Sequence, residues 1–135
     1  MVVANFELKI PLKAEYVSIA RLTVSGVANR AGFDFDAIED IKVCLSEVCN
    51  RLINNKIQNN QFEDADCRIQ FVLSDNDLAI DFYMDEFDTW EPEIMDDDQD
   101  EYSKLGLSLL NLLMDDMKSN PSKGCVLSMR KNIES

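Results

Sequence analysis

Two side chains of opposite charge lie one helical turn apart in the segment SEVCNRLINN, residues 46–55. Glu47 carries a carboxylate that can act as a base, and Arg51 carries a permanent positive charge that can contact phosphate. A Glu four residues before an Arg is also the favourable order for a surface ion pair, which stabilises a helix by only about 0.3–0.5 kcal/mol. The segment is therefore either part of an active site or an ordinary salt bridge.

Two further candidates stand at the ends of predicted elements. Asp85 follows the strand pattern LAIDFYM, at a point where binding residues are common. Gly106 lies beside the first turn of a helix predicted over 105–117, where backbone N–H groups can approach a phosphate. One glycine is a weak signal, because phosphate loops usually carry two or three. The acidic run 96–101 lacks the glycine and the final glutamate of an EF-hand, which excludes a calcium loop of that kind.

The composition excludes several kinds of chemistry. The 135 residues include no histidine, which removes Ser-His and Cys-His nucleophiles, and the four cysteines form no C-x-x-C pair. We expect these cysteines to be buried and reduced. The net charge of −13 disfavours nucleic acid and anionic membranes and suits a basic protein partner, although solubility alone would also explain it. No membrane span or signal-peptide layout is visible, so we expect a cytoplasmic protein.

The apolar patterns predict one α+β domain over residues 1–135. Helical spacing predicts helices over 14–31, from about Asp36 onward, and over 105–117, with Gly32 ending the first helix. Asp36 and Glu39 resemble a capping box for the second. Alternating patterns predict the strands NFELKI, CRIQFVL, LAIDFYM and CVLSMRK, with SDND as the turn of a hairpin. The order β-α-α-β-β-α-β favours a two-layer α/β sandwich.

Three segments together resemble the bacterial anti-sigma-factor serine-protein kinases of the GHKL ATPase superfamily, which also includes the histidine kinases and gyrase. These segments are EYVSIARLTVSGVANRAGFDFDAIEDIKVCLSEVCN, LAIDFYMDEFDTWEPE and LGLSLLNLLMDDM. They span nearly the whole chain, and the predicted element order agrees with the α/β sandwich of that superfamily. The resemblance implies a regulator of stress-response or sporulation sigma factors that works by partner switching and forms homodimers.

The resemblance assigns roles to residues of the second predicted helix. Glu47 matches the glutamate that acts as general base in the family. Four residues later the family has an asparagine that helps to hold Mg²⁺, but this chain has Arg51, and Asn50 lies one residue too early, about 100° round the helix. A guanidinium has no lone pair for a metal ion, and it lowers the basicity of a neighbouring carboxylate. Arg51 therefore argues against both Mg²⁺ binding and general-base catalysis.

The two glycine motifs of the family's nucleotide site are also altered. Asp85 matches the adenine-binding aspartate, but Phe87 replaces the glycine that follows it in the Asp-x-Gly motif. In the second motif, Gly106 matches the last glycine and precedes Leu107, while Lys104 replaces the first glycine. A ring at position 87 fills space that glycine leaves for adenine. We expect ATP binding and kinase activity to be weakened or lost and no cofactor to be needed.

The alternative is a working kinase that uses ATP and Mg²⁺ to phosphorylate a serine of an anti-anti-sigma factor. In that case Glu47 would be the base, Asp85 would contact adenine, and Arg51 and Lys104 would supply positive charge to the phosphates. A third interpretation keeps only the fold and gives the protein an unrelated partner.

The family's partner-binding residue is better preserved. The first helix of the family carries an arginine used against both the sigma factor and its anti-anti-sigma antagonist, and Arg21 in IARLTVSG matches it. Without the resemblance, a solvated helix arginine is the simpler interpretation. With it, the sequence predicts an anti-sigma-factor-like protein that binds a sigma factor, an anti-anti-sigma factor or both.

Overall fold

The computed structural model describes residues 1–59, 66–84, 101–120 and 125–133. Within these ranges the chain forms a short 3-10 turn, three α-helices and five β-strands. In chain order they are β1 (Val2–Pro11), η1 (Ala14–Tyr16), α1 (Val17–Ala31), α2 (Phe35–Asn59), β2 (Asp66–Ser74), β3 (Asp77–Met84), α3 (Glu101–Leu113), β4 (Asp116–Asn120) and β5 (Cys125–Asn132). Asp85, Phe87 and residues 96–100 of the acidic run lie outside the described residues.

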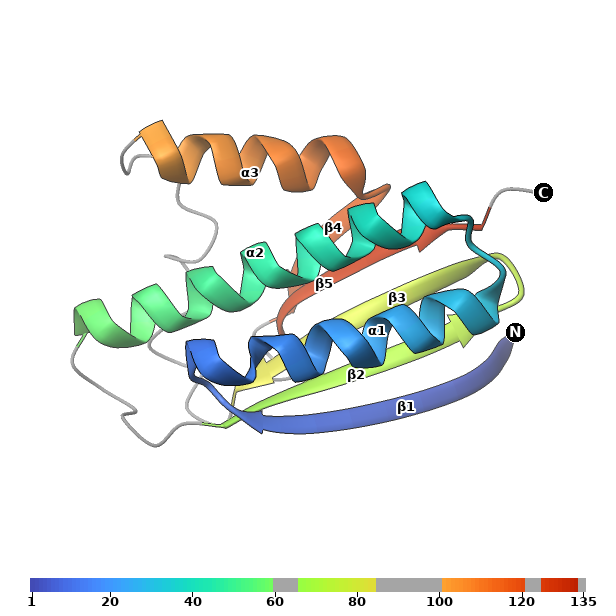
Figure 1. Ribbon diagram of the computed structural model, residues 1–135, viewed down its shortest axis with the longest axis horizontal. Coiled ribbons are helices and arrows are strands. Elements are labelled where there is room, and N and C mark those ends of the chain that lie inside the picture. Colours follow the sequence, from blue (N-terminus) through green and yellow to red (C-terminus); the bar gives the residue numbers. More distant parts are fainter. Residues whose placement is uncertain (60–65, 85–100, 121–124, 134–135) are drawn as a thin grey trace.

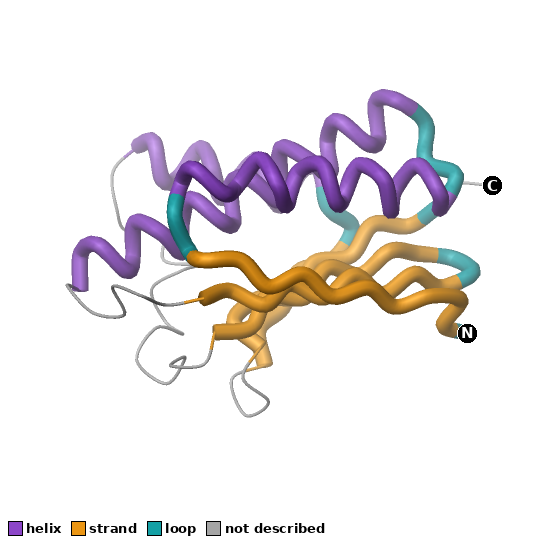
Figure 2. Tube along the Cα trace, turned by 60° about the horizontal axis from the view of Figure 1, so that its bottom comes forward, coloured by secondary structure: helices purple, strands orange, loops and turns teal. Residues whose placement is uncertain are grey.

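The strands form one antiparallel sheet in the order β1-β2-β3-β5-β4. Figures 1 and 2 show the three helices together on one face of this sheet, which makes a two-layer sandwich. The predicted α+β class is therefore confirmed. The predicted element order is incomplete, because it lacks β4.

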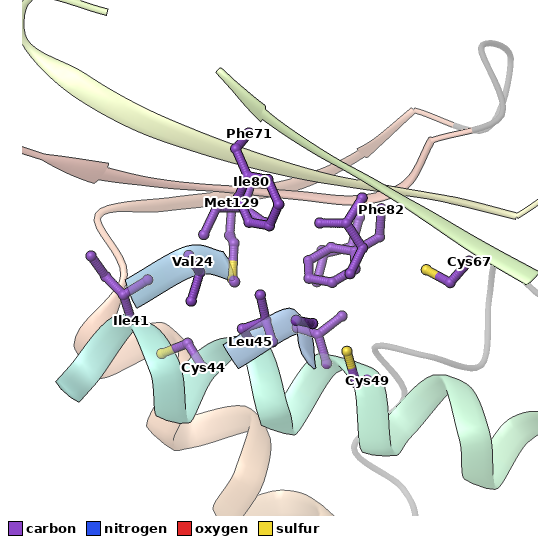
Figure 3. Packing of buried hydrophobic residues seen from close by; sticks show 14 of the residues in the cluster. Val24, Ile41, Cys44, Leu45, Cys49, Cys67, Phe71, Ile80, Phe82 and Met129 are labelled. Carbon is purple, nitrogen blue, oxygen red and sulfur yellow. The ribbon is translucent and has the colours of Figure 1, made fainter. Parts of the chain in front are cut away.

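The core lies between the sheet and the helices. In the hairpin of β2 and β3, every second side chain is buried, and Phe71 lies directly opposite Ile80. Ile41 and Leu45 of α2 and Val24 of α1 are also fully buried and pack into the same cluster (Figure 3). The alternating and helical apolar patterns of the sequence therefore correspond to one continuous core, which fixes the face that α2 turns toward the sheet.

Glycine and aspartate set the boundary between α1 and α2. Gly32 ends α1 in the left-handed conformation at φ 96°, and its N–H bonds to the carbonyls of Ala28 and Asn29. This position was predicted, and glycine suits it because it has no Cβ to clash. The predicted cap at Asp36 is wrong: Asp34 Oδ1 accepts the hydrogen bond from the Ala37 N–H at 2.8 Å. Because α2 begins at Phe35, Asp36 already lies in its first turn.

The third helix differs from the prediction at both ends. It covers Glu101–Leu113 rather than 105–117, and residues 116–120 form β4 instead. Met114 and Met117 continue the helical apolar spacing past the helix. However, Met117 pairs with Met129 of β5, and the Asp115 N–H bonds to the Arg130 carbonyl at 2.9 Å. Gly106 is thus the sixth residue of α3. The prediction that it lies at the helix N-terminus, where free N–H groups could receive a phosphate, is wrong.

Candidate functional site

Glu47 and Arg51 form an ion pair that is largely covered. Both lie on α2, and the Arg51 Nε–H donates to Glu47 Oε1 at 3.1 Å. The Arg51 side chain is 9% exposed and the Glu47 side chain 18%. The predicted pairing is therefore confirmed, but the pair is withdrawn from water rather than displayed on the surface.

Gly106 of α3 provides part of this cover. A Cβ atom built on Gly106 would overlap Glu47 Oε1, and it would lie 2.7 Å from Glu47 Cδ and 3.2 Å from Arg51 Nη2. Real Cβ atoms essentially never come as close as 3.0 Å to another heavy atom. The backbone of α3 therefore lies directly against the end of the Glu47 side chain, and a larger residue at position 106 would require that carboxylate to shift.

Other residues of the predicted nucleotide site are spread around this contact. Lys104 is exposed on α3, and Leu107 is half-buried next to Gly106. Asn50 is exposed on α2, in contrast to the covered Arg51 that follows it. The structure thus brings together Glu47, Arg51 and Gly106, while the roles predicted for Lys104, Leu107 and Asn50 stay predictions.

Arg21 lies on the exposed side of α1, as a partner-binding residue requires. Two large apolar side chains within two residues of it in the sequence are also exposed, Leu22 at 75% and Ile19 at 44%. The sequence analysis did not single them out. A signal was present, because neither residue falls on the helical stripe of buried positions Val17, Ala20, Val24 and Val27.

A separate hollow of about 680 Å³ lies where α2 begins. Three of its polar lining residues have structural roles: Asp34 caps α2, Asp115 Oδ2 accepts the Asn132 N–H at 2.6 Å, and Lys131 Nζ donates to the Leu113 carbonyl at 2.7 Å. None of Glu47, Arg51 and Gly106 lines it. The hollow therefore lies apart from the described residues of the predicted nucleotide site.

The four cysteines are free and buried, as predicted. Burial is the main cause that raises the pKa of Cys44 to about 12, and the charges of Asp40 and Glu47 add to the effect. Burial likewise raises the pKa of Cys49 to about 12. Such thiols stay protonated near neutral pH and are poor nucleophiles.

Two other kinds of site can be compared with the described part of the chain. Among the described residues, no group of three or more His, Cys, Asp or Glu side chains could hold a metal ion. None of the described helices is both long and apolar enough to cross a membrane.

Known proteins resemble this chain over most of its length. The family described as "Histidine kinase-like ATPase domain" matches residues 10–131. Proteins named serine-protein kinase RsbW from Bacillus cereus strain AH187, Bacillus thuringiensis strain Al Hakam and Bacillus anthracis strain A0248 are each 36% identical to it. Each of these alignments covers 96% of this chain and 86% of the relative.

Proposed function

This chain belongs to the histidine kinase-like ATPase domain family, within its bacterial anti-sigma-factor serine-protein kinases, and on this premise we propose that it is an anti-sigma-type regulator. It acts by binding a sigma factor, an anti-anti-sigma factor or both. The identity of 36% over nearly the whole chain to proteins named serine-protein kinase RsbW is the observation that carries this proposal.

The exposed side of α1 is the proposed binding face. Arg21 supplies a charge that can pair with a partner carboxylate, and Leu22 supplies apolar surface that a partner can bury. Arginine and large apolar side chains are common anchors of protein interfaces. The net charge of −13 attracts a basic, DNA-binding partner at long range, while contacts such as those of Arg21 fix the complex. The family implies a homodimer, and the net charge of −13 disfavours direct contact with nucleic acid. We propose a cytoplasmic location for it.

The nucleotide site is proposed to be weakened or lost. The Glu47 carboxylate is already paired with a guanidinium and touched by Gly106 of α3. A magnesium-bound nucleotide would have to compete with the guanidinium for that carboxylate, and Arg51 offers no lone pair to the metal ion in exchange. The residues at this position therefore do not fit Mg²⁺, and we derive no phosphoryl-transfer step through it.

A second candidate function is an active serine-protein kinase. The presence of Glu47 favours it, because this residue matches the family's general base, and so do the printed names of the relatives. In a working kinase, however, the carboxylate must be available to a substrate hydroxyl. The pairing with Arg51 therefore makes this candidate the weaker one.

Binding measurements with the Arg21→Glu variant test the main proposal. The partners are the sigma factor and the small anti-anti-sigma protein encoded nearest to the gene, each titrated by calorimetry. We expect the variant to bind at least tenfold more weakly, which corresponds to about 1.4 kcal/mol. Arg30→Glu is the matched control, because Arg30 is also exposed on α1 but lies about 180° from Arg21 round the helix. If both substitutions weakened binding equally, or if Arg21→Glu left the affinity unchanged, the exposed side of α1 around Arg21 would not be part of the interface.

A further inference from the structure

Helices α2 and α3 lie side by side and run in opposite directions in the helix layer (Figures 1 and 2). Two places fix how they align. Near the middle of α3, Gly106 lies against the Glu47 side chain of α2. Just past the end of α3, Asp115 lines the same hollow as Asp40 of α2. The second half of α3 therefore runs along the first half of α2, over about three helical turns.

Exposed apolar side chains lie on this stretch of both helices. Leu112 of α3 is 79% exposed, and Val43 of α2 is 41% exposed. Val43 follows Asp36 by seven residues and Asp40 by three, and this spacing puts the three side chains on one side of α2. Apolar surface thus continues into an acidic end. We call these four residues, together with Asp115, the α2–α3 seam.

The acidic end of the seam is the hollow of about 680 Å³. Its charged lining residues are Asp34, Asp36, Asp40, Asp115 and Lys131. The Lys131 Nζ already donates to the Leu113 carbonyl, and Asp34 and Asp115 each accept a backbone N–H. Asp36 and Asp40 lie one turn apart on α2, and like charges at this spacing destabilise a helix. A cation brought to the hollow would relieve this repulsion.

We propose that the α2–α3 seam is a second docking surface, which binds a basic amphipathic segment of the sigma factor. Apolar side chains of the segment cover Val43 and Leu112, and an arginine or lysine enters the hollow beside Asp36 and Asp40. An amphipathic helix with its apolar face in a groove is a common mode of recognition. The inference rests on the proposed function for the identity of the partner, but it concerns a surface other than the one around Arg21.

Charge complementarity selects this occupant. A DNA-binding protein carries clustered lysine and arginine side chains, because it must neutralise phosphates. Carboxylates of the hollow can take the place of those phosphates, which would also keep the bound segment from DNA. A second copy of this chain would bring its own net charge of −13 and therefore suits the hollow less well.

Two double variants that remove the same charge distinguish the seam from the overall field of the protein. Asp36→Asn/Asp40→Asn changes the seam, whereas Glu7→Gln/Asp75→Asn changes two exposed carboxylates on the sheet side of the molecule. In calorimetric titrations with the sigma factor we expect at least tenfold weaker binding for the first variant and less than threefold for the second. Leu112→Gln should weaken binding about fivefold. Urea titrations check that every variant is folded.

A synthetic peptide tests the seam without the sigma factor. The probe is a labelled peptide of roughly twelve residues, with leucine on one helical face and arginine on the other. Its counterpart has glutamate in place of arginine. In fluorescence anisotropy, Asp36→Asn/Asp40→Asn should weaken binding of the arginine peptide at least tenfold, and Glu7→Gln/Asp75→Asn less than threefold. The glutamate peptide should not bind.

A selective loss of binding in the Asp36→Asn/Asp40→Asn variant, with both the sigma factor and the arginine peptide, supports the seam. Equal losses in the two double variants overturn it, because they would indicate attraction by net charge alone. A selective loss with the peptide but not with a sigma factor that binds overturns the choice of partner. So does a selective loss with the anti-anti-sigma factor alone, or a shifted monomer–dimer equilibrium in sedimentation, because the seam would then have another occupant.

Failure of the proposed function has a different signature. In that case neither the sigma factor nor the anti-anti-sigma factor binds the wild-type protein. The arginine peptide then decides by itself whether the seam accepts a basic segment, since its binding depends on Asp36 and Asp40 and on no candidate partner.

Discussion

Replacing Arg51 by alanine should destabilise the protein far more than the loss of an ordinary helical ion pair. Removing one partner of a fully buried pair costs about 3–5 kcal/mol, whereas an exposed pair one turn apart is worth about 0.3–0.5 kcal/mol. Arg51 is almost fully covered, but Glu47 keeps 18% of its side-chain surface exposed and can regain some hydration. We therefore expect Arg51→Ala to lower the free energy of unfolding by about 2 kcal/mol, between these two limits.

The assay is urea unfolding followed by far-ultraviolet circular dichroism, with a control in the same helix. Lys42 pairs with Glu39 at 2.9 Å, but Glu39 is 43% exposed, so Lys42→Ala should cost less than about 0.5 kcal/mol. Arg51→Met keeps much of the aliphatic bulk and should lose nearly as much stability as Arg51→Ala. In 1 M salt the effect at Lys42 should vanish while that at Arg51 persists, because covered charges are screened less. If Lys42→Ala and Arg51→Ala lowered the free energy of unfolding by similar amounts, the conclusion that the Glu47–Arg51 pair is shielded from water would be refuted.

Three other outcomes are expected. Millimolar Mg-ATP should cause little saturable change in the fluorescence of the single tryptophan, Trp90, and Arg51→Asn should increase any nucleotide affinity, with calorimetry as the check for both. Burial raises the pKa of Cys49 to about 12 from an ordinary value of 9.0, so above pH 9 the folded state binds more protons than the unfolded state. The free energy of unfolding should therefore fall as the pH rises above 9. Cys49→Ala should make this fall smaller, as measured by chemical denaturation at each pH. Asp34→Ala should cost about 1 kcal/mol through loss of the α2 cap, whereas Asp36→Ala, measured in the same unfolding experiment, should cost less.

The sequence predicted those parts of the fold that depend on local patterns. The alternation in residues 67–84 indicated which side chains of the hairpin face the core, because a one-residue slip would turn Phe71 and Ile80 toward water. Gly32 marked the end of α1, because glycine adopts its φ of 96° without strain. The cap of α2 was harder to assign, since Asp34 and Asp36 are both suitable side chains and only the helix start at Phe35 decides between them.

The parts that were missed depend on contacts between distant segments. Met114 and Met117 continue a helical apolar spacing, yet the chain leaves the helix and forms β4 from Asp116, because β5 offers backbone partners that the local sequence does not reveal. The spacing of Glu47 and Arg51 predicts an ion pair, but only the packing of α3 shows that the pair is covered. The position of Gly106 was misjudged for the same reason. Because α3 begins at Glu101, Gly106 lies at a contact between α3 and α2 rather than at a helix N-terminus.

The central claim is that this protein regulates by binding a protein partner and does so without its family's nucleotide. Titration of the candidate sigma factor and anti-anti-sigma factor in the absence and presence of Mg-ATP tests it most directly. We expect a complex with at least one of them, with a dissociation constant that Mg-ATP leaves unchanged and with no phosphate transferred to either protein. A complex that forms only with Mg-ATP, or phosphorylation of a serine in the anti-anti-sigma factor, would contradict this account and identify an active kinase.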